Sequence, residues 1–231
     1  MPFNLRAELH CHSNDNNFPN IYFPLFRDST QTSSEIVDAC VRKNIKILAI
    51  TDHDSLIGYK NAKKYIKDNH LDILLIPACE VTAQEGHILA YNIHEEIPRK
   101  IPSRQVVDNI HSQGGIAVCA HPFMIHYHGK RVYDYPFDAI EGLNAAIPMP
   151  PNYKAISVSN ELELPFIAGS DAHEKPAVGN AQTIFPDLVK TPEDFQKCLL
   201  SGKFSISFKH SSYLNMFTEH VIQAKNNLLK P

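Results

Sequence analysis

Short apolar runs alternate with helical patterns along almost the whole chain, and this alternation limits the folds that are available. Seven runs have the length and composition of buried strands: residues 45–51, 71–78, 86–93, 116–120, 137–144, 165–170 and 203–208. Repeated strand–helix units favour a mostly parallel sheet covered by helices. Because so many units fit within 231 residues, we expect a single domain over residues 1–231, built as a barrel rather than an open sheet.

Capping signals mark the helices that separate these strands. A capping-box pattern runs from Thr32 to Glu35, and Thr191 precedes a proline at the first helical position. Ser103 is predicted to cap a third helix. The helices are expected near residues 32–41, 55–69, 103–115, 191–202 and 212–228. Residues 14–30 lack periodicity, and they are predicted to form an inserted loop over one mouth of the barrel.

Composition excludes several classes of partner. The net charge is −3 and hydrophobic residues make up 43% of the chain, so neither a basic nucleic-acid surface nor a polybasic membrane anchor is expected. No basic segment followed by an apolar run opens the sequence, and no apolar run is long enough to span a bilayer. The five scattered cysteines are typical of reduced, buried thiols. We therefore expect a cytoplasmic protein whose partner is a small molecule.

Histidine and acidic residues gather where the predicted strands end. They occur in six separated segments, which contain His10 and His12, Asp52-His53-Asp54, Glu80, His121, Glu141, and Asp171 with His173. A further histidine, His87, introduces the strand at residues 86–93. His10 and His12 share one face of a strand, because side chains alternate, and Cys11 turns away into the core. In a parallel barrel all C-terminal strand ends open at one mouth, so these side chains are predicted to converge.

Each of these residues also has a plain structural interpretation. His121 before a proline is compatible with a hydrogen-bonded core histidine, Asp52 and Asp54 with helix caps, and Glu80 with an exposed loop. Their joint occurrence at strand ends instead favours a shared binding site. Several carboxylates in a partly dry cleft repel one another unless cations are present. Carboxylates and neutral imidazoles are the ligands that divalent cations require, so the pattern predicts a metal cluster.

The motifs HxH, TDHDS, a lone glutamate, AHP and GSDAH occur here in the order found in the PHP (polymerase and histidinol phosphatase) family, which this chain resembles over residues 7–185. The resemblance implies a distorted seven-stranded (β/α) barrel of the TIM type. It also implies two or three divalent ions at the C-terminal mouth of the strands. The family's characterised enzymes mostly hydrolyse phosphate esters.

The resemblance further implies a set of nine metal ligands. These are His10, His12, Glu80 and Asp171 for a first ion, Glu80, His87 and His121 for a second, and His53, His173 and Asp28 for a third. Many relatives supply the last carboxylate from an SDG close behind HxHS, where this chain has Asp15. We prefer Asp28, because RDSTQTSSEIV looks like that family segment displaced by an insertion. Glu141 and Asn144 match a less defined E-x-x-N segment, where Glu141 is either a supporting residue or a strand-end carboxylate.

The ligand types suit Mn²⁺, Fe²⁺ or Zn²⁺, because histidine and carboxylate are mixed without thiolate. Two ions bridged by Glu80 would generate hydroxide from a shared water for in-line attack on phosphorus. A third ion would position the phosphate. Candidates for proton transfer to the leaving group are Asp52, Asp54, His126 and His128. Lys130 and Arg131 are candidates for gripping a second anionic group, or are solvated loop charges.

The predicted function is therefore metal-dependent hydrolysis of a small organic phosphate or a short nucleotide. Three alternatives remain open. The chain could be a nuclease or nucleoside 3′,5′-bisphosphate phosphatase of the same family, or a non-catalytic metal-binding module. It could also hydrolyse a non-phosphate bond on an amidohydrolase-like barrel, although that superfamily commonly bridges its metals with a carbamylated lysine rather than a glutamate. The substrate, the native metal and the oligomeric state are not specified by the sequence.

Overall fold

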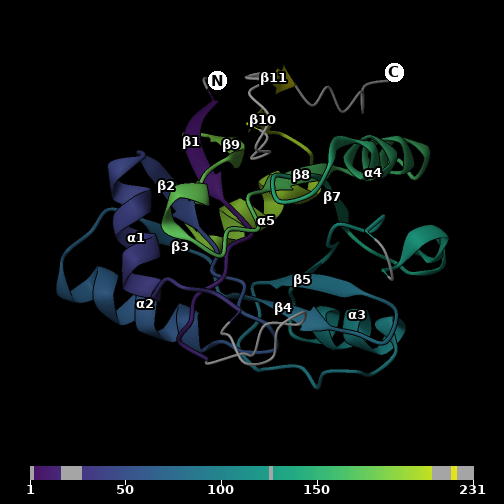
Figure 1. Ribbon diagram of the computed structural model, residues 1–231, viewed down its shortest axis with the longest axis horizontal. Coiled ribbons are helices and arrows are strands. Elements are labelled where there is room, and N and C mark those ends of the chain that lie inside the picture. Colours follow the sequence, from purple (N-terminus) through teal and green to yellow (C-terminus); the bar gives the residue numbers. More distant parts are fainter. Residues whose placement is uncertain (1–2, 17–27, 125–126, 210–219, 223–231) are drawn as a thin grey trace.

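The computed structural model describes residues 3–16, 28–124, 127–209 and 220–222, and it arranges them as two β-sheets with flanking helices (Figure 1). One sheet has six strands in the order β11-β10-β9-β1-β2-β3, and the other has five in the order β4-β5-β6-β7-β8. The strands are β1 (Phe3–Glu8), β2 (Ile45–Leu48), β3 (Leu74–Leu75), β4 (Ala78–Thr82), β5 (His87–Tyr91), β6 (Ile116–Cys119), β7 (Ala139–Asn144), β8 (Phe166–Gly169), β9 (Ala181–Pro186), β10 (Ser205–Phe208) and β11 (His220–Ile222).

The mixed α/β class is confirmed, whereas a closed TIM-like barrel is not. Parallel pairs join β1 to β2, β2 to β3, β6 to β7 and β7 to β8. Antiparallel pairs join β4 to β5, β5 to β6, and β9 to both β1 and β10. The segment between β4 and β5 spans only residues 83–86, which is too short for the crossover that parallel strands need. The mostly parallel sheet was therefore an incorrect expectation.

Two isolated bridges connect the sheets at the end of the molecule where the predicted ligands lie. Cys11, just beyond β1, pairs in parallel with Ala172, just beyond β8. His53, beyond β2, pairs in parallel with Glu80 on β4. Backbone hydrogen bonds accompany the first bridge, from the His12 N–H to the Ala172 carbonyl at 2.9 Å. The ends of strands from both sheets are thereby brought together.

The two sheets share one apolar core. Its buried residues include Leu9 beyond β1 and Ile47 on β2 from the first sheet, and Leu89 on β5 and Ile167 on β8 from the second. Tyr91 at the end of β5 is fully buried in it, and its hydroxyl donates to the Leu9 carbonyl at 2.8 Å. Burial of apolar area of this extent is the main source of folding free energy. The core lies beneath the strand ends and gives them a fixed base.

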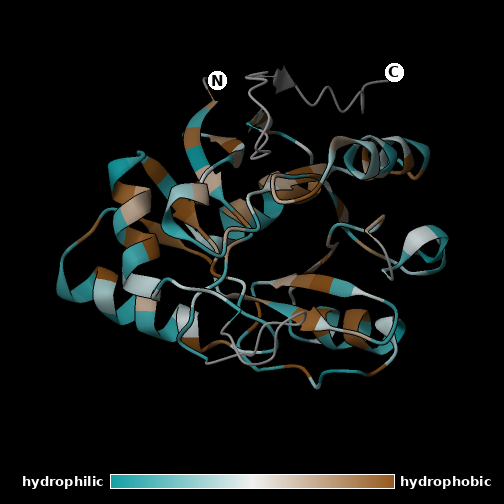
Figure 2. Cartoon of the chain, in the orientation of Figure 1, coloured by the Kyte–Doolittle hydropathy of each residue, from teal (hydrophilic) through white to brown (hydrophobic). Residues whose placement is uncertain are grey.

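Helices flank the two sheets. They are α1 (Ser33–Arg42), α2 (Ile57–Asp68), α3 (Ser103–Ser112), α4 (Met149–Glu161) and α5 (Pro192–Leu200), with short 3₁₀ segments η1 (Gly129–Asp134) and η2 (Lys175–Ala177). Apolar residues of α1 and α2 pack against β2, and those of α3 and α4 pack against β5, β6 and β7. In Figure 2, α1 and α3 carry both hydrophobic and hydrophilic residues, as expected for helices with one buried face.

Two of the three predicted helix caps are confirmed. Thr32 and Thr191 each accept a hydrogen bond from the backbone of the third helical residue, and both form full capping boxes. Ser103 is not a cap, because Pro102 occupies that position and Ser103 is the first residue of α3. Its hydroxyl instead donates to Glu85 at 2.7 Å. The local pattern suggested a cap, but the Ser103 side chain instead hydrogen-bonds Glu85, which lies 18 residues away in the sequence.

The remaining differences concern segments with weak local signals. Helix α4 and strand β9 were not predicted. The expected helix at residues 212–228 is wrong at residues 220–222, which form β11 against β10; its other residues lie outside the described part of the chain, as do 17–27 of the predicted inserted loop. Within the described ranges, no helix combines the length and apolar character needed to cross a bilayer.

We predict that Thr191→Ala lowers the free energy of unfolding by about 1 kcal/mol, the usual cost of losing an N-cap. The hydroxyl of Thr191 satisfies the Asp194 N–H at the start of α5, and alanine leaves that donor without its partner. Urea denaturation followed by circular dichroism would measure the change. Thr191→Ser is the matched control, because serine keeps the hydroxyl. Equal losses in both variants would contradict a capping role.

Candidate metal centre

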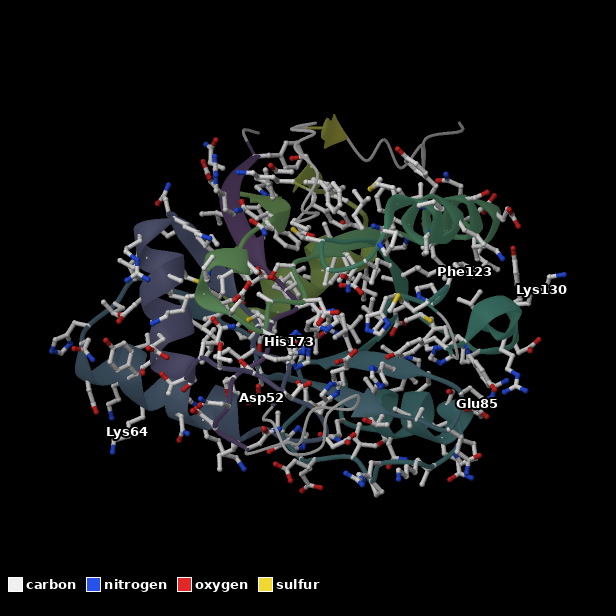
Figure 3. The ribbon with its side chains drawn as sticks, viewed as in Figure 1. Asp52, Lys64, Glu85, Phe123, Lys130 and His173 are labelled. Atoms are coloured by element: carbon white, nitrogen blue, oxygen red, sulfur yellow. The ribbon has the colours of Figure 1, made fainter. Side chains whose placement is uncertain are left out.

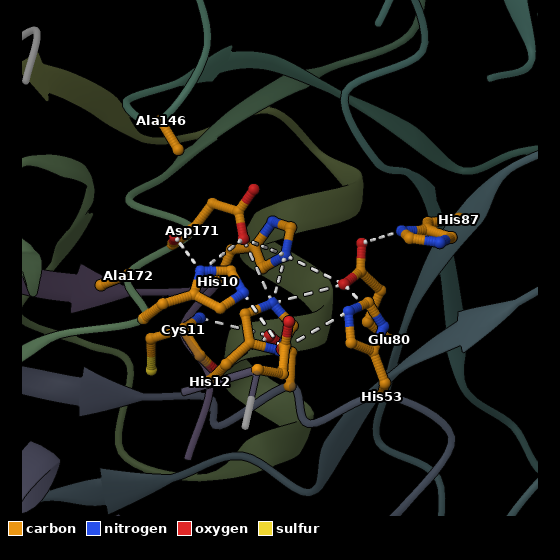
Figure 4. A network of polar contacts seen from close by, with 12 residues as sticks. His10, Cys11, His12, His53, Glu80, His87, Ala146, Asp171 and Ala172 are labelled. Atoms are coloured by element: carbon orange, nitrogen blue, oxygen red, sulfur yellow. Dashed lines mark hydrogen bonds and ion pairs between the residues drawn. The ribbon is translucent and has the colours of Figure 1, made fainter. Parts of the chain in front are cut away.

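Four predicted ligand atoms from three separated segments meet at one point (Figure 4). The Nε2 atoms of His10 and His12 lie 3.2 Å apart. The Glu80 Oε2 lies 3.4 Å from the first and 3.3 Å from the second. The Asp171 Oδ1 lies 3.3 Å and 3.2 Å from the same two atoms. His10 and His12 project to the same side of the extended chain, and Cys11 is buried in the core, as the alternation predicted.

These separations fit the coordination shell of a single ion. In a tetrahedral site the distance between two ligand atoms is the metal–ligand distance multiplied by about 1.6. A Zn–N or Zn–O distance of about 2.0–2.1 Å then gives ligand separations of about 3.3–3.4 Å. The five separations above range from 3.2 to 3.4 Å. These five separations are therefore those expected between ligands of one small divalent cation.

Hydrogen bonding of neutral side chains does not account for this arrangement. The Nδ1 atom of His10 lies 2.8 Å from Glu141 Oε1, so a neutral His10 donates there and has no hydrogen on Nε2. Its Nε2 lone pair then faces two carboxylates. Burial opposes a charge on His12, but its hydrogen bonds to Asp171 and Glu80 raise its pKa to about 10. Without a cation the histidines must take up protons to balance the carboxylates.

Glu80 uses its second oxygen for a neighbouring group. Oε1 lies 3.0 Å from His87 Nδ1 and 3.0 Å from His121 Nε2. The hairpin of β4 and β5 sets His87 opposite Thr82, so that it reaches back toward Glu80. One carboxylate therefore serves two groups of histidines, which is the arrangement of a bridging ligand.

A third group surrounds Asp28. Its Oδ2 lies 3.1 Å from His173 Nε2 and 3.7 Å from His53 Nε2. The Nδ1 of His12 is buried without a hydrogen-bond partner and lies 4.0 Å from the same oxygen. Asp15, the other candidate, instead accepts a hydrogen bond from Asn61. The chain path thus brings Asp28 to the cluster and leaves Asp15 outside it.

The described residues contain four overlapping groups in which three or more ligand atoms lie within 4.8 Å of one another. Together these groups use the nine predicted ligands and no other described residue: His10, His12, Asp28, His53, Glu80, His87, His121, Asp171 and His173. The donor set is histidine and carboxylate, which is characteristic of divalent metal sites.

Glu141 and Asn144 are not predicted ligands, but they hydrogen-bond the residues that are. Besides receiving His10 Nδ1, the Glu141 carboxylate accepts the His121 N–H at 3.0 Å and the Asn144 amide at 3.0 Å. The same amide donates to Asp171 Oδ2 at 3.1 Å, which leaves Oδ1 to face His10 and His12. All of these groups are buried or nearly so, and they fix the tautomer and orientation of the ligands.

Glu8 is a supporting residue that sequence reasoning missed. It is fully buried, and its carboxylate accepts the N–H groups of His10 and Ser170 at 3.1 Å each and that of Gly179 at 2.6 Å. Burial raises the pKa of Glu8, although these hydrogen bonds oppose the rise. The carboxylate ties the HxH segment to the segment that carries Asp171. An acidic residue between two apolar residues, Ala7 and Leu9, was the available signal.

Three of the four predicted proton-transfer candidates, Asp52, Asp54 and His128, do not line the cavity. Asp52 accepts the N–H and the hydroxyl of Ser13 at 2.6 and 2.7 Å, and Asp54 accepts the Thr82 N–H at 2.7 Å. His128 is buried against Ser103, with 3.1 Å between its Nε2 and the hydroxyl. These contacts brace the segments that carry the ligands. His126 lies outside the described residues.

Lys130 and Arg131 are also remote from the cluster. Both lie on η1, are exposed and do not line the cavity. Figure 3 shows Lys130 at the edge of the molecule, whereas His173 lies near the centre of the view. The structure therefore favours the interpretation of these residues as solvated loop charges.

The cluster opens into a cavity of about 260 Å³. Its lining residues are Asp28, His53, Glu80, His87, His121, Met124, Tyr127, Ala146, Ile147, Asp171 and His173. Seven of these are predicted ligands, and the other four are uncharged. His173 has 35% of its side chain exposed, so the cluster is accessible from this side.

A family model described as PHP-associated matches residues 150–204. The chain is 28% identical to the uncharacterized protein MJ1587 of Methanocaldococcus jannaschii over 61% of this chain and 82% of that protein. Its fold is similar to a two-domain protein of Bacteroides vulgatus containing a predicted PHP-like metal-dependent phosphoesterase, with a TM-score of 0.70 and 17% identity. That match covers 89% of this chain and 65% of the other, so the chain spans just under two thirds of that relative.

The fold is also similar to the lesion-specific endonuclease PfuEndoQ of Pyrococcus furiosus. The TM-score is 0.59 at 16% identity, and the match covers 85% of this chain and 56% of the endonuclease. At these identities the solved structures establish a shared fold and do not extend to activity.

We predict that Glu141→Gln lowers divalent-metal affinity about 10–100-fold, the usual effect of altering a residue that hydrogen-bonds a ligand. Glutamine has only one accepting oxygen, so it cannot serve both the two donors at Oε2, the His121 N–H and the Asn144 amide, and the His10 Nδ1–H at Oε1. Competition with a chromophoric chelator would measure the affinity. Glu161→Gln, an exposed change on α4, is the control. Unchanged affinity in Glu141→Gln would contradict the supporting role.

We also predict that metal-dependent stabilisation grows with pH. The pKa of His12 in the metal-free fold, about 10, lies above its ordinary value. Its stabilising contribution is therefore complete below about pH 6.5 and is lost as pH rises toward 10. Metal binding requires neutral histidine, so the metal affinity increases over the same pH range. The Tm difference between Mn²⁺-loaded and EDTA-treated protein should widen from pH 6.5 to 9.5, and a constant difference would contradict this assignment.

Proposed function

We propose that the chain is a member of the PHP family and that it hydrolyses phosphate esters with divalent metal ions held by the nine clustered side chains. The observation that carries this proposal is the bridging position of Glu80. Its two oxygens each face a separate group of histidines, at 3.3–3.4 Å on one side and 3.0 Å on the other. Hydrolysis assisted by two metal ions uses ions about 3.5–4 Å apart, and a shared carboxylate is suited to holding them at such a spacing.

The residues divide into three proposed sites. The first comprises His10, His12, Glu80 and Asp171, the second Glu80, His87 and His121, and the third Asp28, His53 and His173. Bound there, Mn²⁺, Fe²⁺ or Zn²⁺ would acidify a coordinated water and neutralise phosphate charge. The protein's own contribution is to hold the ligands in register through Glu141, Asn144 and Glu8, so that little reorganisation is needed during reaction.

The substrate phosphate is proposed to enter beside Asp28 and His173. Asp28 is only 8% exposed, His173 is partly exposed, and both line the cavity. We assign no proton transfer to Asp52, Asp54 or His128, whose polar contacts are with Ser13, Thr82 and Ser103. These three residues are proposed to position loops rather than to touch the substrate.

The alternatives have weaker support. Likeness to an endonuclease concerns the fold, and a cavity of about 260 Å³ suits a small ester better than a nucleic-acid duplex. A purely structural metal module would not need a cluster that opens to solvent through His173. Hydrolysis of a non-phosphate bond shares the same metal chemistry, and a substrate panel distinguishes it.

The proposal predicts that metal-loaded protein releases phosphate from at least one small monoester. Asp171→Asn should lower turnover at least about 100-fold, since changes to residues that merely support a ligand already cost about 10–100-fold. The assay would use Mn²⁺, Fe²⁺ and Zn²⁺ separately with sugar, amino-alcohol and aryl phosphates, nucleoside 3′,5′-bisphosphates and 5′-phosphorylated oligonucleotides. Asp187→Asn, an exposed change after β9, is the matched control.

Turnover that survives in Asp171→Asn would point to a contaminating phosphatase and sink the assignment. Metal-loaded protein that hydrolyses no phosphate ester, but cleaves an amide or lactone, would move the function to the non-phosphate alternative. Oligonucleotide cleavage without monoester turnover would favour the nuclease alternative.

A further inference from the structure

The cavity has two chemically different walls, and only one of them is explained by metal binding. Seven lining residues belong to the proposed metal sites. The other four, Met124, Tyr127, Ala146 and Ile147, carry no charge and come from two loops, the one after β6 and the one after β7. Resting on the proposed function, we propose that Met124, Tyr127 and Ile147 form a leaving-group subsite. Its substrate class is a phosphate monoester of an uncharged apolar or aromatic group.

Tyr127 fixes one side of this subsite. Its ring lies edge-on to two predicted ligands, with ring centroids 4.9 Å from His87 and 4.8 Å from His121 and interplanar angles of 83° and 80°. Such edge-to-face pairs are favourable and hold the rings in a defined orientation. Two turn-like hydrogen bonds set the loop, from Met124 N–H to the His121 carbonyl and from Tyr127 N–H to the Met124 carbonyl. The aromatic ring therefore borders the second proposed metal site.

The loop after β7 fixes the other side. The Asn144 side-chain carbonyl accepts the Ala146 N–H at 2.9 Å, while its amide donates to Asp171. The Ala145 N–H is bound to the Gly169 carbonyl at 3.1 Å. Ile147 follows directly and is 4% exposed. In Figure 4, Ala146 lies beyond Asp171, on the opposite side of the cluster from His87.

The Asn144 side chain thus orients both the loop that forms part of the apolar wall, through Ala146, and the proposed metal ligand Asp171. Since Tyr127 borders His87 and His121, and the Ala146–Ile147 segment is tied to Asp171, the apolar wall reaches from the first proposed site to the second. A phosphate held by those ions would direct its ester oxygen and the attached group toward this wall.

The charge of the lining residues and the volume of the cavity limit which leaving group the subsite can bind. Among the described lining residues there is no lysine or arginine, so a second phosphate or a carboxylate on the substrate meets no matching cation among them. Hydroxyl groups pressed against Met124 and Ile147 would lose water without gaining partners. The volume of about 260 Å³ lies just below the range of about 300–1,000 Å³ for drug-sized ligands, and it must also hold the ions. A single ring or a short apolar chain fits these limits.

Non-hydrolysable phosphonates test the subsite by binding alone. Isothermal titration calorimetry of the Mn²⁺-loaded protein would compare phenylphosphonate, methylphosphonate and 2-hydroxyethylphosphonate. We expect phenylphosphonate to bind at least about 10-fold more tightly than the other two, because even one methylene in an apolar pocket changes affinity about 10-fold or more. In Tyr127→Ala and Ile147→Thr the ratio of dissociation constants should fall below about threefold.

Two further variants separate ring contact from general disturbance. Tyr127→Phe keeps the ring and should restore the preference for phenylphosphonate. Tyr153→Ala, on α4, removes a tyrosine that is 59% exposed and serves as the matched surface control. Circular dichroism and bound-metal analysis of each variant would verify the fold and the loading.

Each outcome decides the proposal. Equal affinities in the unaltered protein, tighter binding of the hydroxyethyl compound, or a preference that persists in both Tyr127→Ala and Ile147→Thr would overturn the subsite while leaving phosphate-ester hydrolysis standing. Failure of every phosphonate to bind metal-loaded protein would overturn both the subsite and the proposed function. A phenyl preference that is lost in Tyr127→Ala and kept in Tyr127→Phe would establish the subsite.

Discussion

The arrangement of the whole site depends on one buried carboxylate. Glu80 is 1% exposed and receives imidazole nitrogens at both of its oxygens. Those nitrogens belong to His10, His12 and His53 at one oxygen and to His87 and His121 at the other. Oε2 faces histidines that follow β1 and β2 of the first sheet, and Oε1 faces His87 on β5 and His121 after β6 of the second sheet. A charge buried this deeply is tolerable only when it is fully compensated, so the strand ends are held together by the requirement to satisfy Glu80.

Further buried carboxylates sit outside this cluster and act on the backbone. Glu8 and Glu141 accept N–H groups from the segments that carry His10, His121 and Asp171, and Asp52 accepts that of Ser13, next to the HxH motif. Burial raises the pKa of Glu8, and that of Asp52 to about 6, while their backbone hydrogen bonds oppose the rise. These carboxylates fix the backbone of the segments that carry the predicted ligands. Metal binding and folding of this end of the molecule are expected to be coupled.

The cavity combines a charged wall with an apolar one because uncharged residues of the loops after β6 and β7 reach it. Asn144 links the two walls directly, since its amide contacts Asp171 and its carbonyl holds Ala146. The clustered histidines and carboxylates form the charged wall. Residues such as Tyr127 and Ile147 determine which substrates the proposed subsite selects. Related folds acquire different substrates through loops of this kind.

The sequence by itself determined the α/β class, two helix caps and which residue types would meet. His10 and His12 share a face because the strand period is two, and Thr32 and Thr191 cap helices through contacts three residues away. The tertiary structure decided what depends on chain path: the split into two sheets, the antiparallel β9, and the choice of Asp28 over Asp15. It also turned Asp52, Asp54 and Ser103 to bracing contacts. Local periodicity and capping are written in neighbouring residues, whereas these outcomes depend on partners distant along the chain, which only folding brings within hydrogen-bonding reach.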